Sequence, residues 1–213
     1  MDSPERLVIL VRHGPVAAAW RRRCYGQTDV PLSPAAASEE AAVVSRLPVR
    51  PTLIIDSGLR RTVSLADRLA SRFADAARTS DPRLRERDYG SWEGQTWDAI
   101  CQRHPDLHGL IERPDSYAPY RTADGGETTG EMRRRVVAWF DSLPPGGTIV
   151  AVTHSGPIAS LAGELLGLPA MRWVAWTIGT LGSVAFETSG EATLVRRRDQ
   201  SSGQCPQRVS QPS

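Results

Sequence analysis

The sequence predicts an α/β fold, a three-layer αβα sandwich in which helices cover both faces of a mostly parallel β-sheet. Three short runs rich in Val, Ile and Leu lack polar alternation, as is typical of strands buried on both faces: Leu7–Val11, Leu53–Ile55 and Thr148–Val152. Amphipathic segments follow these runs. The 213 residues, 40% of them hydrophobic, are sufficient for one domain with a substantial core.

Four helices are expected where apolar residues recur at helical spacing. The first has Ser33 as its expected N-cap and Pro34 at its first helical position. The last is closed by Gly167, a C-cap signal. The predicted helices cover Ser33–Leu47, Thr62–Ala77, Glu127–Leu143 and Pro157–Leu166.

The remaining parts of the chain complete the expected organisation. Thr180–Phe186 and Ala192–Arg196 read as a hairpin at a sheet edge, turning at Ser189-Gly190. Residues 89–122, rich in Trp, Tyr and Pro, are expected to form an inserted helical and loop segment over one end of the sheet. We therefore expect one domain over residues 1–199 and a disordered polar tail over residues 200–213.

Composition narrows the function classes. The net charge is +2, which does not call for a nucleic-acid or membrane partner, and no apolar run approaches the roughly 20 residues of a membrane span. All 26 basic residues are arginine, which excludes a P-loop lysine and a Schiff-base lysine. Three scattered cysteines suit a reducing compartment, so a cytoplasmic location is expected. A homodimer is left open.

Charged and polar residues follow each predicted strand. Arg12-His13-Gly14 ends the first, Ser57 to Arg61 follow the second, and Thr153-His154-Ser155-Gly156 ends the third. Because the carboxyl ends of parallel strands share one edge, these groups are expected to meet there. Arginine forks and helix N-termini are suited to an anion with several oxygens. The sequence therefore predicts a phosphate site.

The same segments resemble the histidine phosphatase superfamily, also called phosphoglycerate mutase-like. The Arg-His-Gly triplet at residues 12–14 matches the family's RHG signature, and five further blocks follow in the family's order. The resemblance spans about residues 6–196. The further blocks are Gly26–Ser33, Ser57–Arg61, Leu84–Gly94, Gly125–Thr128 and Thr153–Gly156.

The resemblance implies a mechanism that uses no metal or other cofactor. It makes His13 the nucleophile that carries the phosphoryl group, with Arg12, Arg61 and His154 as the other phosphate-pocket residues. It makes Glu86 the proton donor, and Asp88 remains the alternative. His13 must be neutral to attack, and neighbouring arginines lower the pKa of an imidazole. The same arginines also favour an ionised Glu86, so desolvation or bound phosphate has to supply the opposing effect.

Departures from the family pattern refine the expected reaction. Positions at which mutases carry Glu, Ser and Asn contacts hold Pro15, Val16 and Ala19, so hydrolysis is favoured. Mutase-type phosphoryl transfer and a non-catalytic phosphate-binding module remain alternatives. The segments 24–32 and 92–100 resemble bacterial α-ribazole phosphatases, which implies a small phosphorylated substrate such as α-ribazole 5′-phosphate, with a role in cobalamin synthesis. Thr28 and Arg22 are candidate substrate contacts.

Other conspicuous residues receive ordinary interpretations. Cys101, His104 and His108 have a spacing that resembles that of metal ligands. Pro105 lies between the two histidines and would interrupt the helix that they would need to share a face, so no metal site is expected. Trp92 is interpreted as a packing residue, as is Trp97. The runs Arg133–Arg135 and Arg196–Arg198 are expected to be solvated.

Overall fold

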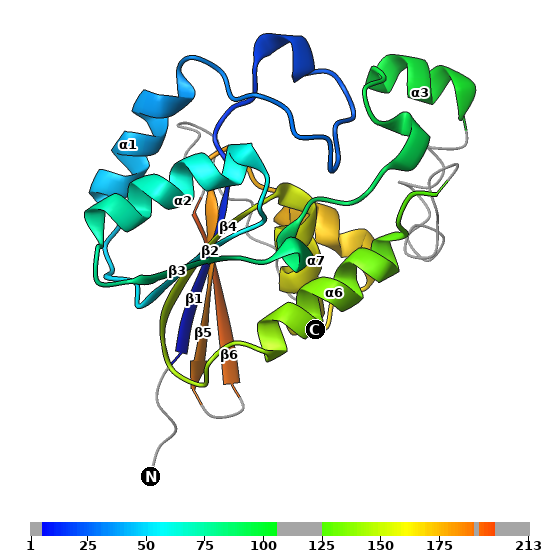
Figure 1. Cartoon of the computed structure of the whole chain (residues 1–213). Coiled ribbons are helices and arrows are strands. Elements are labelled where there is room, and N and C mark those ends of the chain that lie inside the picture. Colours follow the sequence, from blue (N-terminus) through cyan, green and yellow to red (C-terminus); the bar gives the residue numbers. More distant parts are fainter. Residues whose placement is uncertain (1–5, 106–124, 190–191, 199–213) are drawn as a thin grey trace.

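The computed structural model describes residues 6–105, 125–189 and 192–198, which form a six-stranded sheet in the order β3-β2-β4-β1-β5-β6 (Figure 1). The β3–β2, β2–β4 and β4–β1 pairs are parallel, and β5 and β6 join antiparallel beyond β1. This confirms the predicted, mostly parallel sheet. The strands are β1 (Arg6–Arg12), β2 (Leu53–Asp56), β3 (Ala77–Ser80), β4 (Gly147–Thr153), β5 (Ser183–Ser189) and β6 (Ala192–Arg198).

Helices cover both faces of the sheet, so the predicted three-layer architecture is confirmed. Helices α1 and α2 pack on one face, and α6 and α7 pack on the other (Figure 1). The α-helices are α1 (Ala36–Arg46), α2 (Arg60–Arg72), α3 (Trp97–Arg103), α6 (Thr129–Asp141) and α7 (Ser155–Leu165). Short 3-10 turns are η1 (Ala18–Trp20), η2 (Pro82–Leu84), η3 (Gly90–Trp92) and η4 (Ala170–Trp176).

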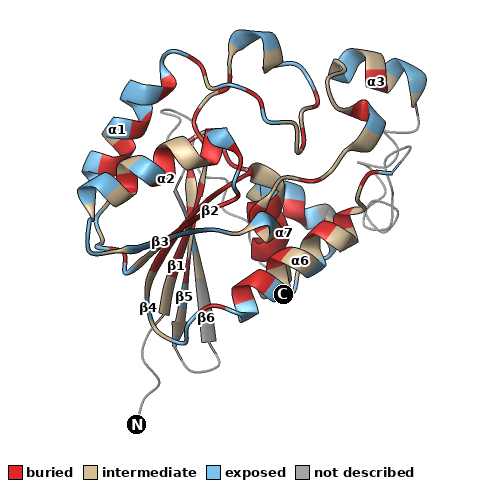
Figure 2. Cartoon of the chain, viewed as in Figure 1, coloured by how far each residue is buried: buried red, intermediate tan, exposed pale blue. Residues whose placement is uncertain are grey.

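The central strand β1 shows why its sequence lacks polar alternation. Val8 and Leu10 pack in the core that includes α6 and α7, whereas Ile9 and Val11 pack against α1 and α2. Both faces of the strand are therefore buried, as Figure 2 shows for the middle of the sheet. Truncating a fully buried leucine such as Leu10 to alanine costs about 2–5 kcal/mol of the unfolding free energy.

The four predicted helices are present, and two of their boundaries differ from the prediction by more than two residues. Helix α1 begins at Ala36 with Ala35 at the N-cap position, so Ser33 is not its N-cap and Pro34 is not its first residue; Pro34 and Ala35 form a turn before the helix, and among the described residues the buried Ser33 hydroxyl has no hydrogen-bond partner. Helix α2 ends at Arg72, and the edge strand β3 follows. The strand sequence Ala-Arg-Thr-Ser is polar and largely exposed, so it carries no hydrophobic signal.

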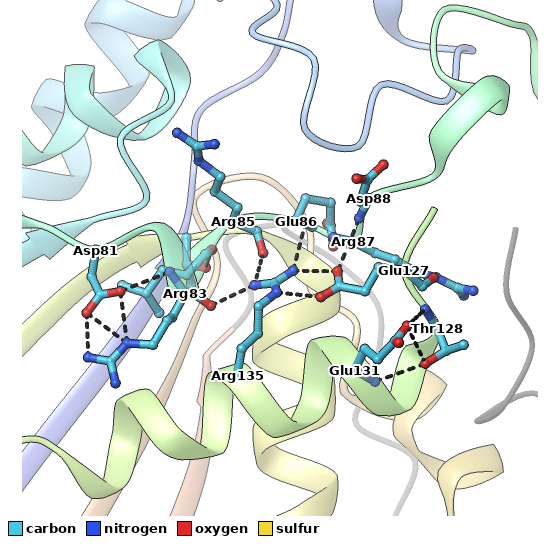
Figure 3. Close-up of polar contacts among 12 residues, drawn as sticks. Asp81, Arg83, Arg85, Glu86, Arg87, Asp88, Glu127, Thr128, Glu131 and Arg135 are labelled. Atoms are coloured by element: carbon cyan, nitrogen blue, oxygen red, sulfur yellow. Dashed lines mark hydrogen bonds and ion pairs between the residues drawn. The ribbon is translucent and has the colours of Figure 1, made fainter. Parts of the chain in front are cut away.

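The C-terminal half follows the prediction more closely. Thr128 is the N-cap of α6 and forms a capping box with Glu131, which is visible in the sequence as T-x-x-E (Figure 3). The predicted hairpin is present as β5 and β6, with β6 at the sheet edge. Its turn, the segment 106–122 of the predicted insertion and the tail 200–213 lie outside the described residues. In the described ranges, no helix combines the length and apolar character needed to cross a membrane.

Candidate active site

The site lies where β1 and β4 end side by side. Arg12 is paired with Thr153 in the parallel register, so His13 and His154 follow neighbouring strands. The centroids of their imidazole rings are 5.1 Å apart, and both residues are buried. The structure therefore has the juxtaposition of strand ends that the sequence predicts.

His13 is held in one orientation by its own backbone turn. Nδ1 lies 2.7 Å from the Gly14 carbonyl oxygen. Because a carbonyl only accepts, the proton belongs on Nδ1, which leaves the lone pair on Nε2. Burial, then the charges of Arg61 and Arg12, lower the pKa of His13 well below its ordinary value. Desolvation is thus a larger cause of the neutral ring than the arginines that the sequence suggested.

His154 is fixed through both ring nitrogens. Its Nδ1 accepts a hydrogen bond from Arg61 Nε at 3.3 Å, so the ring proton belongs on Nε2, 2.9 Å from Ser57 Oγ. Ser57 Oγ also lies 2.9 Å from Thr62 Oγ1 at the start of α2. Burial and the nearby cations lower the pKa of His154, with Arg61 the largest charge contribution. Ser57 belongs to the motif at residues 57–61, but nothing in the sequence indicates its contact with the His154 ring.

The predicted phosphate arginines are placed by carbonyl groups. Arg61 is fully buried and donates to the carbonyls of Thr28 (2.7 Å) and Gly26 (2.6 Å). Arg12 donates through one terminal nitrogen to the Ile178 carbonyl at 2.5 Å. Among the described residues, the buried Arg12 Nε has no hydrogen-bond partner. Carbonyls orient both cations without neutralising them, so their charge remains available to an anion.

Glu93 organises the loop that receives Arg61. Its carboxylate accepts from the backbone N–H groups of Gln27 (2.9 Å) and Thr28 (2.7 Å) and from the Thr28 hydroxyl (2.5 Å). The Thr28 side chain, predicted as a candidate substrate contact, therefore points to Glu93. Sequence reasoning missed this role because the glutamate stands 65 residues from the loop it holds.

Glu86 lies at the N-terminus of α7. One carboxylate oxygen accepts from Arg87 N (2.9 Å) and the other from Gly156 N (3.2 Å). A Cβ at position 156 would lie 2.2 Å from Glu86 Oε1, so the approach of the carboxylate requires glycine there. Since Gly156 is two residues after His154, this contact brings the predicted proton donor to the histidine pair.

Arg135 on α6 holds the backbone that carries Glu86 (Figure 3). Its guanidinium donates to the carbonyls of Arg83 (2.6 Å), Arg85 (2.7 Å) and Glu86 (3.0 Å). Two further bonds, of 2.6 and 2.8 Å, join it to the Glu127 carboxylate. Five charge-assisted contacts thus fix the segment that bears the predicted acid.

The interpretation of Arg133–Arg135 as a solvated run is therefore wrong for Arg135. Its side chain is 19% exposed, because position 135 of α6 faces the Glu86 segment. Arg134 is exposed, and Arg133 forms a half-exposed ion pair with Glu164 at 2.8 Å. An arginine triplet on a helix places each member on a different side, which a composition argument does not separate.

The remaining candidates have other partners. Asp88 Oδ1 accepts from Gly90 N at 2.8 Å, which makes it a turn-capping residue in this structure. Arg22 forms an ion pair with Asp98 at 2.9 Å, with 82% of its side chain exposed. His104 packs on Trp92, whose ring centroid is 5.0 Å away, and His108 lies outside the described residues.

The two tryptophans that the sequence assigns to packing differ in burial. Trp92 is buried beside Cys24 and Ile100, whereas Trp97 is 37% exposed on α3. Among the side chains that the structure places, no group of three or more His, Cys, Asp or Glu is arranged to hold a metal ion.

Comparison with known proteins agrees with this geometry. The sequence matches the family model of the Histidine phosphatase superfamily (branch 1) over residues 8–200. A Mycobacterium tuberculosis protein named glucosyl-3-phosphoglycerate phosphatase is 31% identical over 193 residues, covering 85% of this chain and 83% of that protein. A Yersinia pestis protein named "Probable phosphoglycerate mutase GpmB" is 32% identical over 167 residues, 76% of either chain.

Solved structures share the same architecture. A complex of mycobacterial glucosyl-3-phosphoglycerate phosphatase with VO3 has a TM-score of 0.77 at 29% identity, covering 90% of this chain and 97% of that one. An Escherichia coli structure described as a "putative alpha-ribazole-5'-P phosphatase" has a TM-score of 0.78, covering 92% and 96%. Its identity is 20%, so this likeness concerns the fold alone.

The chain belongs to the histidine phosphatase superfamily. It is a phosphatase of that superfamily, in the class of phosphoric monoester hydrolases.

Proposed function

We propose that this enzyme hydrolyses a small phosphomonoester through a phosphohistidine on His13, without a metal ion. The observation that carries the proposal is the buried pair of His13 and His154, 5.1 Å apart, with Arg61 and Arg12 close enough to lower the pKa of both rings. A neutral imidazole with a free lone pair is a nucleophile, and the arginines supply the positive charge that phosphoryl transfer needs.

The first step transfers the phosphoryl group to the protein. His13 Nε2 attacks phosphorus, and the bond between phosphorus and the ester oxygen breaks as the N–P bond forms. Arg12 and Arg61 donate to the phosphoryl oxygens, and His154, whose Nε2–H is directed to Ser57 Oγ, forms the wall of the phosphate pocket beside them. Glu86, protonated beside the incoming phosphate dianion, gives its proton to the leaving oxygen, a contribution of typically 10²–10⁴-fold.

The second step returns the protein to its starting state. The Glu86 carboxylate takes a proton from water as the water oxygen attacks phosphorus, and the N–P bond breaks. His13 recovers the lone pair on Nε2, inorganic phosphate leaves, and Glu86 is again protonated. One side chain thus acts first as acid and then as base, as microscopic reversibility requires.

For the substrate we propose α-ribazole 5′-phosphate as the first candidate, on the resemblance of segments 24–32 and 92–100. Glucosyl-3-phosphoglycerate is the second, because the Mycobacterium tuberculosis relative, 31% identical, is named for it. Mutase-type transfer is disfavoured by apolar Pro15, Val16 and Ala19, which offer no polar side chain to a second anionic group. Initial rates on a panel containing both candidate esters, with 3-phosphoglycerate as mutase substrate, rank the three.

The central proposal is tested with p-nitrophenyl phosphate in the presence of EDTA. Wild type should hydrolyse it and, after acid-free denaturation of ³²P-loaded protein, should retain label that is stable to alkali and labile to acid. His13→Asn should lose both properties, whereas His104→Asn, a histidine packed outside this cluster, should keep both. EDTA-sensitive turnover, or turnover by His13→Asn, contradicts the proposal.

A further inference from the structure

We propose that the leaving group of the substrate occupies an apolar cavity beside Glu86, and that the enzyme therefore favours phosphomonoesters whose alcohol carries a compact aromatic or aliphatic group. This inference rests on the proposed function, because it takes Glu86 as the group that meets the ester oxygen. It adds the chemical class of the substrate.

The cavity lies between α6, α7 and η4 and has a volume of about 290 Å³. Glu86, Ser155 and Gly156 form one wall, so the cavity begins where the carboxylate is held. A leaving oxygen that receives the Glu86 proton must lie within hydrogen-bond reach of it. The rest of the leaving group, which is attached to that oxygen, would then extend into the cavity.

The opposite walls are made of carbon. Met132 from α6, Ala159 from α7 and Trp173 and Val174 from η4 line the cavity, whose accessible wall is predominantly apolar. The Trp173 ring packs directly on the backbone of Gly163, where a Cβ would lie 1.9 Å from a ring carbon. Because Gly163 has no side chain, the Trp173 ring can pack close to α7, and this position of the ring sets the width of the cavity.

Four polar side chains in the lining donate to protein groups, and one of them, Arg87, donates to the Glu127 carbonyl (2.9 Å) and to Thr129 Oγ1 (3.0 Å). Ser160 Oγ donates to the Pro157 carbonyl (3.1 Å), and Thr177 Oγ1 donates to the Val174 carbonyl (2.8 Å). Trp173 Nε1 donates to the Leu168 carbonyl at 2.9 Å. A leaving group with many hydroxyls would lose its water hydrogen bonds in this cavity and find few replacements, which is costly. Of the two candidate esters, the cavity therefore disfavours glucosyl-3-phosphoglycerate, whose alcohol is a glucoside with several hydroxyl groups, relative to α-ribazole 5′-phosphate, whose alcohol carries an aromatic base.

The size of the cavity limits the apolar group. Ligand pockets commonly measure about 300–1,000 Å³, so 290 Å³ is small and suits a single ring or a short branched chain. Burying one such ring favours binding enough to raise kcat/KM about tenfold or more over a hydrophilic ester of similar length.

The test compares benzyl phosphate with glycerol 3-phosphate, two alkyl esters with poor leaving groups. Wild type should favour benzyl phosphate in kcat/KM by about tenfold or more. Val174 lines the cavity and is 63% exposed, so Val174→Asp places a carboxylate at the cavity entrance and should abolish most of this preference. Leu166→Asp, which places the same carboxylate on a 38%-exposed leucine outside the cavity lining, is the matched control and should keep it.

A second variant guards against effects of charge. Ala159→Leu fills part of the cavity from α7 and should lower kcat/KM for benzyl phosphate by a larger factor than for glycerol 3-phosphate. Equal kcat/KM for the two esters in wild type, or an unchanged preference in both cavity variants, overturns the cavity assignment and leaves the proposed function standing. Failure to hydrolyse either ester, without ³²P-labelled phosphohistidine, overturns the proposed function itself.

Discussion

Replacing Arg135 should impair both stability and the protonation of poor leaving groups. Arg135→Ala removes three donors to the carbonyls of residues 83, 85 and 86 and leaves the Glu127 carboxylate, 14% exposed, without this partner. Breaking a buried ion pair costs about 3–5 kcal/mol, and partial exposure reduces this to about 2–4 kcal/mol of unfolding free energy. In a chain of this size that lowers Tm by roughly 5–15 °C.

The catalytic effect should depend on the leaving group. Without Arg135 the backbone of Glu86 relaxes, so the proposed acid is misplaced but still present. We expect kcat for benzyl phosphate to fall roughly 10- to 100-fold, part of the range attributed to general acids. Hydrolysis of p-nitrophenyl phosphate, whose leaving group needs little protonation, should fall less than about threefold.

Arg133→Ala is the matched control, because Arg133 lies on the same helix in a half-exposed pair with Glu164. It should change the unfolding free energy by about 1 kcal/mol or less and leave both rates unchanged. Arg135→Lys keeps the positive charge but loses the several N–H donors of the guanidinium. Its unfolding free energy and its kcat for benzyl phosphate should lie between those of wild type and Arg135→Ala. Equal slowing of the two esters in Arg135→Ala would refute the positioning argument even if stability fell as expected.

Two further predictions concern the other parts of the site. Burial lowers the folded-state pKa of His13 and of His154, so below the unfolded pKa of about 6.5 the unfolded chain binds protons that the folded chain does not. Denaturant titrations should therefore show stability falling from pH 7.5 to 5.5 by about 1.4 kcal/mol for each buried histidine, and His13→Asn should show the smaller fall; pH dependence identical to wild type would count against this. Glu93→Gln should loosen the loop around Arg61 and lower kcat/KM for every ester by a similar factor, roughly tenfold. Glu39→Gln, on the exposed side of α1, is the control and should leave kcat/KM unchanged. A loss of kcat/KM confined to esters with poor leaving groups would contradict the role assigned to Glu93.

The strands that position the site could be predicted because their signal is local. A fully buried parallel strand needs an unbroken apolar run, and Leu7–Val11 and Thr148–Val152 have one. Since polar residues come directly after these runs, strand direction predicts that His13 and His154 lie at the same edge of the sheet. Their direct contact also requires β1 and β4 to be neighbouring strands, which the structure shows and the sequence does not. Edge strand β3 has no such signal, because only one neighbour pairs with it and its side chains are largely exposed.

The supporting residues were not predictable in the same way. Glu93 holds residues 27 and 28 across 65 positions, and Arg135 holds Glu86 across 49. No periodicity links such positions, and a carboxylate that accepts backbone N–H groups looks in sequence like any surface glutamate. Ser33 is not the N-cap because a turn at Pro34 and Ala35 separates it from the first residue of α1, and the Ser-Pro pattern alone does not show where that turn ends.

These supports divide the proposed chemistry into two separable parts. Glu93 fixes the loop whose carbonyls orient Arg61, so it acts on the charge around the phosphoryl group, which every ester shares. Glu127 and Arg135 fix the segment that bears Glu86, so they act on proton delivery, which matters in proportion to the basicity of the leaving oxygen. A plot of log kcat/KM against leaving-group pKa should therefore shift downward in parallel for Glu93→Gln and become steeper for Arg135→Ala. Glu93 and Glu127 each act through an arginine and a backbone segment, so a general loss of structure would lower the plot for either variant without changing its slope. The difference in slope is therefore the observation that distinguishes the role of Glu93 from that of the Glu127–Arg135 pair.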